Sequence, residues 1–252
     1  HDSVSVLNES SALLRYLNTH VITSNSESPV ITLKDKQGNP NGLVCAIPFL
    51  RPRDIQVSIA GQSSEEKQLS LQNAIHEHYQ SCYQKAVEQR TELNLDIPII
   101  ATGHLTVVGA ELTDSVREIY IGTLDAFPSG AFPPADYIAL GHIHRPQLIG
   151  GQAHIRYSGS PIALSFDESQ QQKSVCLVEF NQHQFANVTL LPIPVFQPLL
   201  SLKGSLKELQ KQLMALPVKE NELPIWLDIE VATQDYLGDI QQRIEALTQE
   251  LP

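Results

Sequence analysis

Hydrophobic residues recur along this chain with two spacings, one typical of helices and one typical of strands. Apolar side chains at three- and four-residue intervals predict amphipathic helices over residues 5–17 and 65–90. Short apolar runs bounded by turn residues predict strands, which we expect at residues 21–23, 30–33, 43–47, 99–103, 118–121, 137–141, 154–157, 174–180 and 185–191. Helices and strands together predict a mixed α/β (α+β) fold.

Turn-rich segments connect several of these strands. Residues 37–42 combine glycine, asparagine and proline and predict the loop of a hairpin. Residues 181–184 are predicted to form a second hairpin turn, with His183 exposed to solvent. Two prolines in residues 48–54 lead us to expect no regular structure there.

A cluster of prolines predicts a domain boundary. Pro192, Pro194 and Pro198 surround residue 196, which divides the chain into domains of residues 1–195 and 196–252. The second domain should run strand, helix, strand, helix, over residues 199–203, 205–216, 225–231 and 235–250. Ser205 and Glu208 have the spacing of a helix capping box. Because two strands make a weak sheet, we expect this small α/β unit to be incomplete.

The composition is typical of a globular protein without membrane spans. The chain has 252 residues, of which 42% are hydrophobic and 18% are charged, and no apolar run approaches the ~18 residues of a membrane span. Its three scattered cysteines predict a cytoplasmic protein without disulfides, in which they fill core space. The net charge of −11 argues against coating of DNA through phosphate contacts. It does not exclude a phosphodiester hydrolase, because bound divalent metals would supply local positive charge.

Two strands are predicted to end in glycine followed by histidine. Residues 99–104 end in Gly103 and His104, and residues 137–144 end in Gly-His-Ile-His. Glycine allows a sharp turn where a strand ends, and ligands bind at the carboxyl ends of strands in open α/β sheets. Residues His142 and His144 would point to the same side of an extended segment. We therefore expect His104, His142 and His144 to contribute to a metal site.

The alternative is that these are ordinary polar residues at strand ends. A single His-x-His pair is weak evidence for a metal site. Two Gly-His strand ends in one chain make a metal site more probable. The available carboxylates lack convincing spacing, and residues 97–145 alone hold too few ligands for a two-metal centre. His76 and His78 lie about 200° apart on the predicted helix, so we expect both to be surface residues.

The motifs resemble those of the calcineurin-like metallophosphoesterases. The Gly-His and Gly-His-x-His pair is similar to the last two motifs of that superfamily, and His1-Asp2 resembles the end of its Gly-Asn-His-Asp motif. A closer resemblance is to the SbcD family, the nuclease subunits of bacterial SbcCD complexes. It rests on residues 47–54, 99–109, 117–127, 132–149, 158–161 and 224–229.

This resemblance implies a fold, a cofactor and partners. The expected fold is a two-sheet αββα sandwich followed by a small capping domain. The implied cofactors are two divalent ions, Mn²⁺ or alternatively Mg²⁺, held in part by His104, His142 and His144. His1 would contact the scissile phosphate or protonate the leaving oxygen. The implied partners are DNA with double-strand ends or hairpins, an SbcC-type coiled-coil ATPase and a second copy of the chain.

The sequence also departs from the family pattern. The Asp-x-His motif, the Gly-Asp motif and the asparagine before His1 are missing, and so is the helical tail that docks on SbcC. We therefore expect a fragment with about half of a catalytic site, inactive by itself. Arg51 and Arg53 are candidates for DNA contacts or for holding the proline loop, and Arg145 for a DNA contact or a surface ion pair.

Three functions follow from these observations. The first is a metal-dependent DNA nuclease that acts in DNA repair and recombination. The second is a phosphodiesterase or phosphatase that uses the same two-metal chemistry on a small molecule. The third is a docking scaffold without catalysis, which the missing aspartates favour and the retained histidines oppose.

Overall fold

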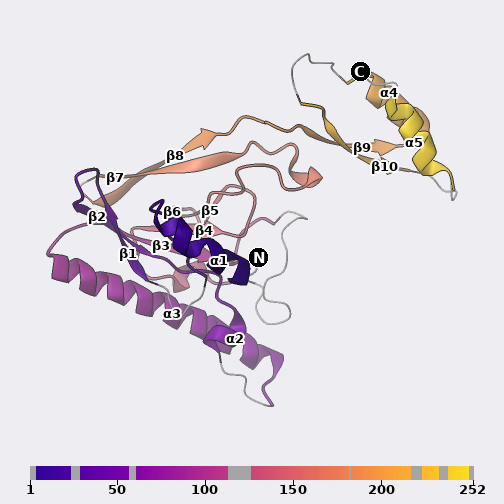
Figure 1. Cartoon of the computed structure of the whole chain (residues 1–252). Coiled ribbons are helices and arrows are strands. Elements are labelled where there is room, and N and C mark those ends of the chain that lie inside the picture. The colour runs from indigo at the N-terminus through magenta and orange to yellow at the C-terminus, as the bar shows by residue number, and fades with distance from the viewer. Residues whose placement is uncertain are drawn as a thin grey trace. The chain divides into compact units, whose positions relative to one another are not determined.

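The computed structural model describes most of the chain as two compact units (Figure 1). One unit comprises His1–Pro161 and Ser174–Pro192, and the other comprises Ile162–Lys173 and Ile193–Pro252. The described residues are 4–23, 29–56, 61–112, 126–181, 183–216, 223–232 and 238–249. None of the helices in these ranges combines the length and the apolar character that a membrane span requires.

The first unit is built on a six-stranded mixed sheet. Its strand order is β1-β2-β3-β4-β6-β5, and the bounds are β1 Val30–Lys34, β2 Pro40–Cys45, β3 Ile99–His104, β4 Tyr137–Gly141, β5 Gln147–Ile149 and β6 Gln152–Tyr157. The four inner strands are parallel, whereas β1 and β5 pair in antiparallel fashion at the two edges. The predicted α/β class and the predicted hairpin between β1 and β2 are therefore confirmed.

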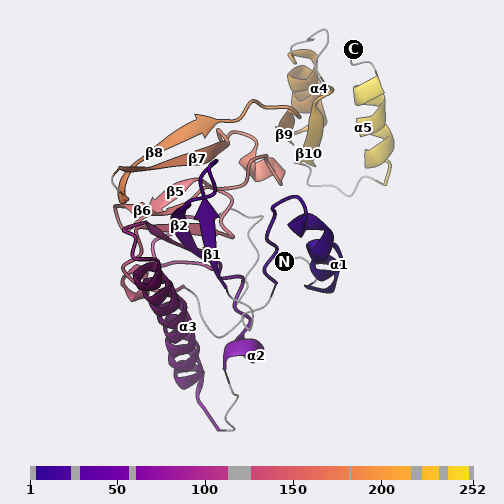
Figure 2. The same cartoon turned by 60° about the vertical axis from the view of Figure 1, so that its left-hand side comes forward.

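Helix α3, Ser64–Leu93, covers one face of this sheet (Figures 1 and 2). A capping box between Ser63 and Glu66 defines its first turn. Its buried stripe follows the predicted helical spacing and consists of Leu71, Ile75, Tyr79, Cys82 and Ala86. These side chains pack on the sheet residues that alternate toward the same face, because successive strand residues point to opposite sides.

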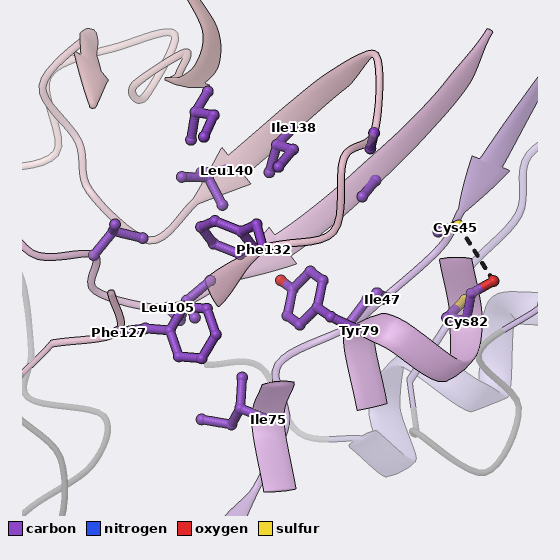
Figure 3. Packing of buried hydrophobic residues seen from close by; sticks show 14 of the residues in the cluster. Cys45, Ile47, Ile75, Tyr79, Cys82, Leu105, Phe127, Phe132, Ile138 and Leu140 are labelled. Atoms are coloured by element: carbon purple, nitrogen blue, oxygen red, sulfur yellow. Dashed lines mark hydrogen bonds between the residues drawn. The ribbon is translucent and has the colours of Figure 1, made fainter. Parts of the chain in front are cut away.

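An aromatic cluster occupies the core beneath the end of β3 (Figure 3). The ring of Tyr79 lies 6.2 Å from that of Phe127 and 5.1 Å from that of Phe132, measured between ring centroids. Elsewhere in this core the Cys45 thiol lies 3.6 Å from the carbonyl oxygen of Cys82. Both cysteines are buried and neither forms a disulfide, which confirms that these two fill core space, whereas Cys176, also free, is only half-buried.

The remaining elements of the first unit are two helices, a 3₁₀ turn and a hairpin. They are α1 Val4–Arg15, α2 Pro52–Ile55, η2 Ser129–Ala131, β7 Ser174–Asn181 and β8 Gln184–Pro192. The β7–β8 hairpin confirms the predicted turn, in which His183 is exposed. The expected strand at residues 118–121 lies outside the described residues.

Two local predictions were wrong. Residues 21–23 form no strand, since this run of three residues pairs with none of the strands in the described part of the chain. Residues 52–55 form the short helix α2 in spite of their proline. Pro52 occupies the first turn of that helix, where the missing backbone N–H would have had no partner in any case.

The second unit contains two parallel strands and two helices. Their bounds are β9 Leu199–Gly204, α4 Leu206–Met214, β10 Trp226–Val231 and α5 Ile240–Gln249. The predicted capping box between Ser205 and Glu208 is present at the start of α4. Leu202, Leu209 and Leu213 form the buried centre of this unit. The segment 162–173 adds a buried ion pair in which the Lys173 ammonium lies 2.7 Å from the Glu168 carboxylate.

Candidate functional site

Two of the predicted histidines meet at the carboxyl ends of neighbouring strands. Strands β3 and β4 are parallel, and their register places His104 opposite Gly141. His142 follows directly, and the centroids of the His104 and His142 rings are 5.2 Å apart. A side chain at Gly141 would crowd this arrangement, because its Cβ would lie 3.3 Å from Nδ1 of His104. We call His104 and His142 the histidine pair.

The second histidine of the pair has an unusual backbone conformation. His142 is buried and has φ of +98°, in a region that residues with side chains rarely occupy. Strand β4 ends at Gly141, so the expectation that an extended segment continues through His142 to His144 is wrong. The side-chain alternation of a strand does not extend beyond its last residue.

The environment of His142 favours a neutral imidazole. Burial, followed by the electrostatic effects of His104 and His144, lowers the pKa of His142 to about 4. The ring is therefore uncharged at neutral pH, the form in which imidazole binds metals. The Nε2 atoms of both rings are shielded from bulk solvent. This donor set fits part of the ligand shell of a transition metal.

The described residues do not assemble a complete metal centre. Within these ranges, no three His, Cys, Asp or Glu side chains gather closely enough to hold an ion. His144 is half-buried and lies near enough to His142 to lower its pKa. The carboxylate of Asp136 accepts a hydrogen bond of 2.7 Å from the backbone N–H of Ile99, which is a structural role. His1 lies outside the described residues, as do Asp2, Asp114 and Asp125.

The loop that follows β2 approaches His104, which sequence reasoning had not connected with this site. The Thr102 hydroxyl accepts a hydrogen bond of 2.9 Å from the Ile47 N–H and lies 3.1 Å from the Ile47 carbonyl oxygen. The Phe49 ring then meets the His104 ring edge-on, with 6.1 Å between centroids. The available signal was that residues 47–49 belong to residues 47–54, one of the segments on which the family resemblance rests.

The histidines of α3 are less exposed than expected. His76 and His78 are half-buried, so their prediction as surface residues was wrong. Nδ1 of His76 lies 2.7 Å from the carbonyl oxygen of Ala131 and links α3 to η2. Burial, and secondarily the charge of Lys85, lowers the pKa of His78. Helical spacing alone did not show that η2 folds back onto this part of the helix.

Comparison with known proteins relates the whole chain to one group of nucleases. The chain is 53% identical over 252 residues to SbcD of the SbcCD nuclease from Escherichia coli K12, covering all of this chain and 62% of that protein. It is 30% identical over 266 residues to the SbcD protein of Rhodobacter capsulatus, covering all of this chain and 64% of the relative. The SbcD protein of Bacillus subtilis is 27% identical over 258 residues, covering 89% of this chain and 65% of the relative.

The chain belongs to the SbcD family. It spans slightly less than two thirds of the length of these SbcD relatives. Residues 195–252 also match a family profile described as "Type 5 capsule protein repressor C-terminal domain".

All three candidate DNA-binding arginines lie within ion-pair distance of a carboxylate in this SbcD-family chain. The Arg51 guanidinium contacts the Asp54 carboxylate at 2.5 Å, and Arg145 pairs with Glu111. The Arg53 side chain is 76% exposed and lies 3.7 Å from Asp54. The Arg145–Glu111 pair is exposed, and exposed pairs of this kind contribute at most about 1 kcal/mol.

The strained backbone of His142 leads to a stability prediction for this SbcD-family chain. His142→Gly and His142→Ala both remove the imidazole, but only glycine adopts a φ of +98° without strain. We expect the glycine variant to be more stable than the alanine variant by about 1 kcal/mol, reversing the usual order of these residues in regular structure. Urea unfolding of the two variants would measure this difference. Equal stabilities, or a more stable alanine variant, would show that residue 142 carries no backbone strain.

Proposed function

We propose that the protein containing this chain is a metal-dependent DNA nuclease that hydrolyses phosphodiester bonds together with an SbcC-type ATPase. The relatives named above are nuclease subunits of SbcCD, and the similarity extends over this entire chain. The observation that carries the proposal is the histidine pair at the ends of β3 and β4. Shielded imidazole nitrogens at the carboxyl edge of a parallel sheet suit a metal that acts on a phosphate.

The proposed fold is the two-sheet αββα sandwich, with residues 196–252 as a capping domain. The β7–β8 hairpin supports a second layer on the face of the sheet opposite α3. Its Phe185 ring stacks on Tyr137 of β4 at 6.0 Å and lies 6.3 Å from His154 of β6. Burial raises the pKa of Tyr137 to about 12, as expected for a phenol enclosed between two layers.

The residues of this chain would have distinct tasks in that reaction. His104 and His142, with His144, would hold part of a pair of divalent ions, Mn²⁺ or Mg²⁺. Bound metal would neutralise phosphate charge and lower the pKa of a water molecule. His1 is the proposed acid for the leaving oxygen, and Arg51, Arg53 and Arg145 are the proposed contacts to the DNA backbone. The proposed substrates are double-strand ends and hairpins, and the proposed assembly includes a homodimer.

A substrate comparison tests this proposal. The protein that contains this chain, with its SbcC-type partner, would be given end-labelled duplex DNA, hairpin DNA, a cyclic nucleotide and a chromogenic phosphodiester in the presence of Mn²⁺. Cleavage of DNA that EDTA stops and Mn²⁺ restores is the expected result. A preference for the small diesters would point to the second function considered above, and absence of both Mn²⁺ binding and cleavage would point to a scaffold.

A further inference from the structure

The residue that ends β6 contacts the backbone directly after the first histidine of the pair. Tyr157 is fully buried. Its hydroxyl donates a hydrogen bond of 2.5 Å to the carbonyl oxygen of Leu105 and accepts one of 3.1 Å from the N–H of Val107. Leu105 is covalently joined to His104. The phenol therefore fixes the direction in which the chain leaves β3, immediately beyond the His104 ring.

The next residues contact the segment that follows the second histidine of the pair. The Ser160 N–H donates a hydrogen bond of 3.0 Å to the carbonyl oxygen of His144. Gly159 has φ of +79°, and a Cβ there would lie 2.7 Å from the same oxygen and 2.8 Å from the nitrogen of Pro146. Only glycine allows the two backbones to approach so closely. Ser160 is itself buried, so this contact is shielded from water.

These contacts connect residues 157–160 to two other segments, one after His104 and one after His142. His104 and His142 are 38 residues apart in the sequence and lie at the ends of different strands. His142 has a positive φ, and such a conformation persists only where the surrounding structure enforces it. The chain leaves His142 toward His144, whose carbonyl oxygen is held by Ser160. One short segment, residues 157–160, therefore contacts the backbone next to both members of the histidine pair.

We propose that residues 157–160 are a positioning element that sets the spacing and orientation of the histidine pair for metal binding. This inference rests on the proposed function for the metal, but the positioning itself involves only residues of the described structure. Groups that orient metal ligands without touching the metal typically change metal affinity roughly 10-fold to 100-fold when they are replaced. A segment that merely stabilised the fold would not move the histidine rings selectively.

The test compares two glycines that have the same backbone requirement. Gly159→Ala introduces a Cβ against His144 and Pro146, whereas Gly151→Ala has a similar φ of +71° and no atom within 4 Å of the added Cβ. We expect Gly159→Ala to shift the imidazole NMR signals of His142 and His144 without metal, and to weaken broadening of the His104 and His142 signals by Mn²⁺ roughly 10-fold or more. Gly151→Ala should leave the histidine signals as in the wild type.

A second pair of variants keeps the test decisive if Gly159→Ala does not fold. Tyr157→Phe removes the hydroxyl that holds Leu105 and Val107, and Tyr83→Phe removes a hydroxyl that donates to Pro134 from a more exposed position. We expect only Tyr157→Phe to shift the His104 signals.

The possible outcomes separate the two proposals. If Mn²⁺ does not broaden the histidine signals of the wild type, the metal proposal fails, while the metal-free signals still test positioning. If Gly159→Ala and Tyr157→Phe give the same histidine signals as their controls, Gly151→Ala and Tyr83→Phe, the positioning inference is overturned.

Discussion

Replacing either member of the histidine pair is expected to abolish Mn²⁺-dependent DNA cleavage by the protein that contains this chain. The two rings lie 5.2 Å apart, and the lowered pKa of His142 keeps that ring uncharged at neutral pH. Alanine at either position would remove one of the two imidazole nitrogen donors of the histidine pair. Since residues that only orient metal ligands already affect activity roughly 10-fold to 100-fold, loss of a ligand should exceed 100-fold.

The measurement is the rate of Mn²⁺-dependent cleavage of duplex DNA by His104→Ala and His142→Ala. His183→Ala is the matched control, because His183 lies in the exposed turn between β7 and β8. Its rate should stay within about twofold of the wild type. Thermal unfolding of each variant would show that the fold is retained. Wild-type activity in either variant of the pair would remove that histidine from the proposed site.

Gly103→Ala is expected to destabilise the first unit by about 3 kcal/mol, at the upper end of the range for overpacked cores. A Cβ at Gly103 would lie 2.0 Å from the hydroxyl oxygen of Tyr79, 3.2 Å from its Cζ and 3.1 Å from Cδ2 of Leu105. Tyr79 cannot easily withdraw, because it is almost fully buried and packs against Phe127 and Phe132 (Figure 3).

A double-mutant cycle isolates this contact. Tyr79→Phe removes the oxygen and leaves the ring carbon 3.2 Å from the added Cβ as the closest part of that side chain. We expect Gly103→Ala to lower the free energy of unfolding by only about 1 kcal/mol in the Tyr79→Phe background. Urea unfolding of the wild type, both single variants and the double variant would give the four values. An equal loss in both backgrounds would show that the Tyr79 hydroxyl is not the source of the destabilisation.

Local sequence patterns correctly predicted the elements that bury a single face. The helical spacing of Leu71, Ile75 and Tyr79 predicted the face of α3 that is buried. The turn at residues 37–42 predicted the β1–β2 hairpin. Where the local signal was short, it misled: residues 21–23 form no strand, and Pro52 begins a helix. Whether residues 21–23 form a strand depends on a neighbouring strand, which a short run of residues does not specify. Whether Pro52 permits a helix depends on its position in the first turn, which the presence of a proline does not specify.

For the candidate site, the sequence by itself singled out the histidines and predicted that they lie at the ends of strands. Only the tertiary structure decided that β3 and β4 are parallel neighbours, with His104 opposite Gly141. It also decided the positive φ of His142 and the contacts from Tyr157, Gly159 and Ser160. The physical reason is that periodicity and turn residues report local conformation. Strand order and the meeting of distant backbones depend instead on which buried surfaces pack together across the whole unit.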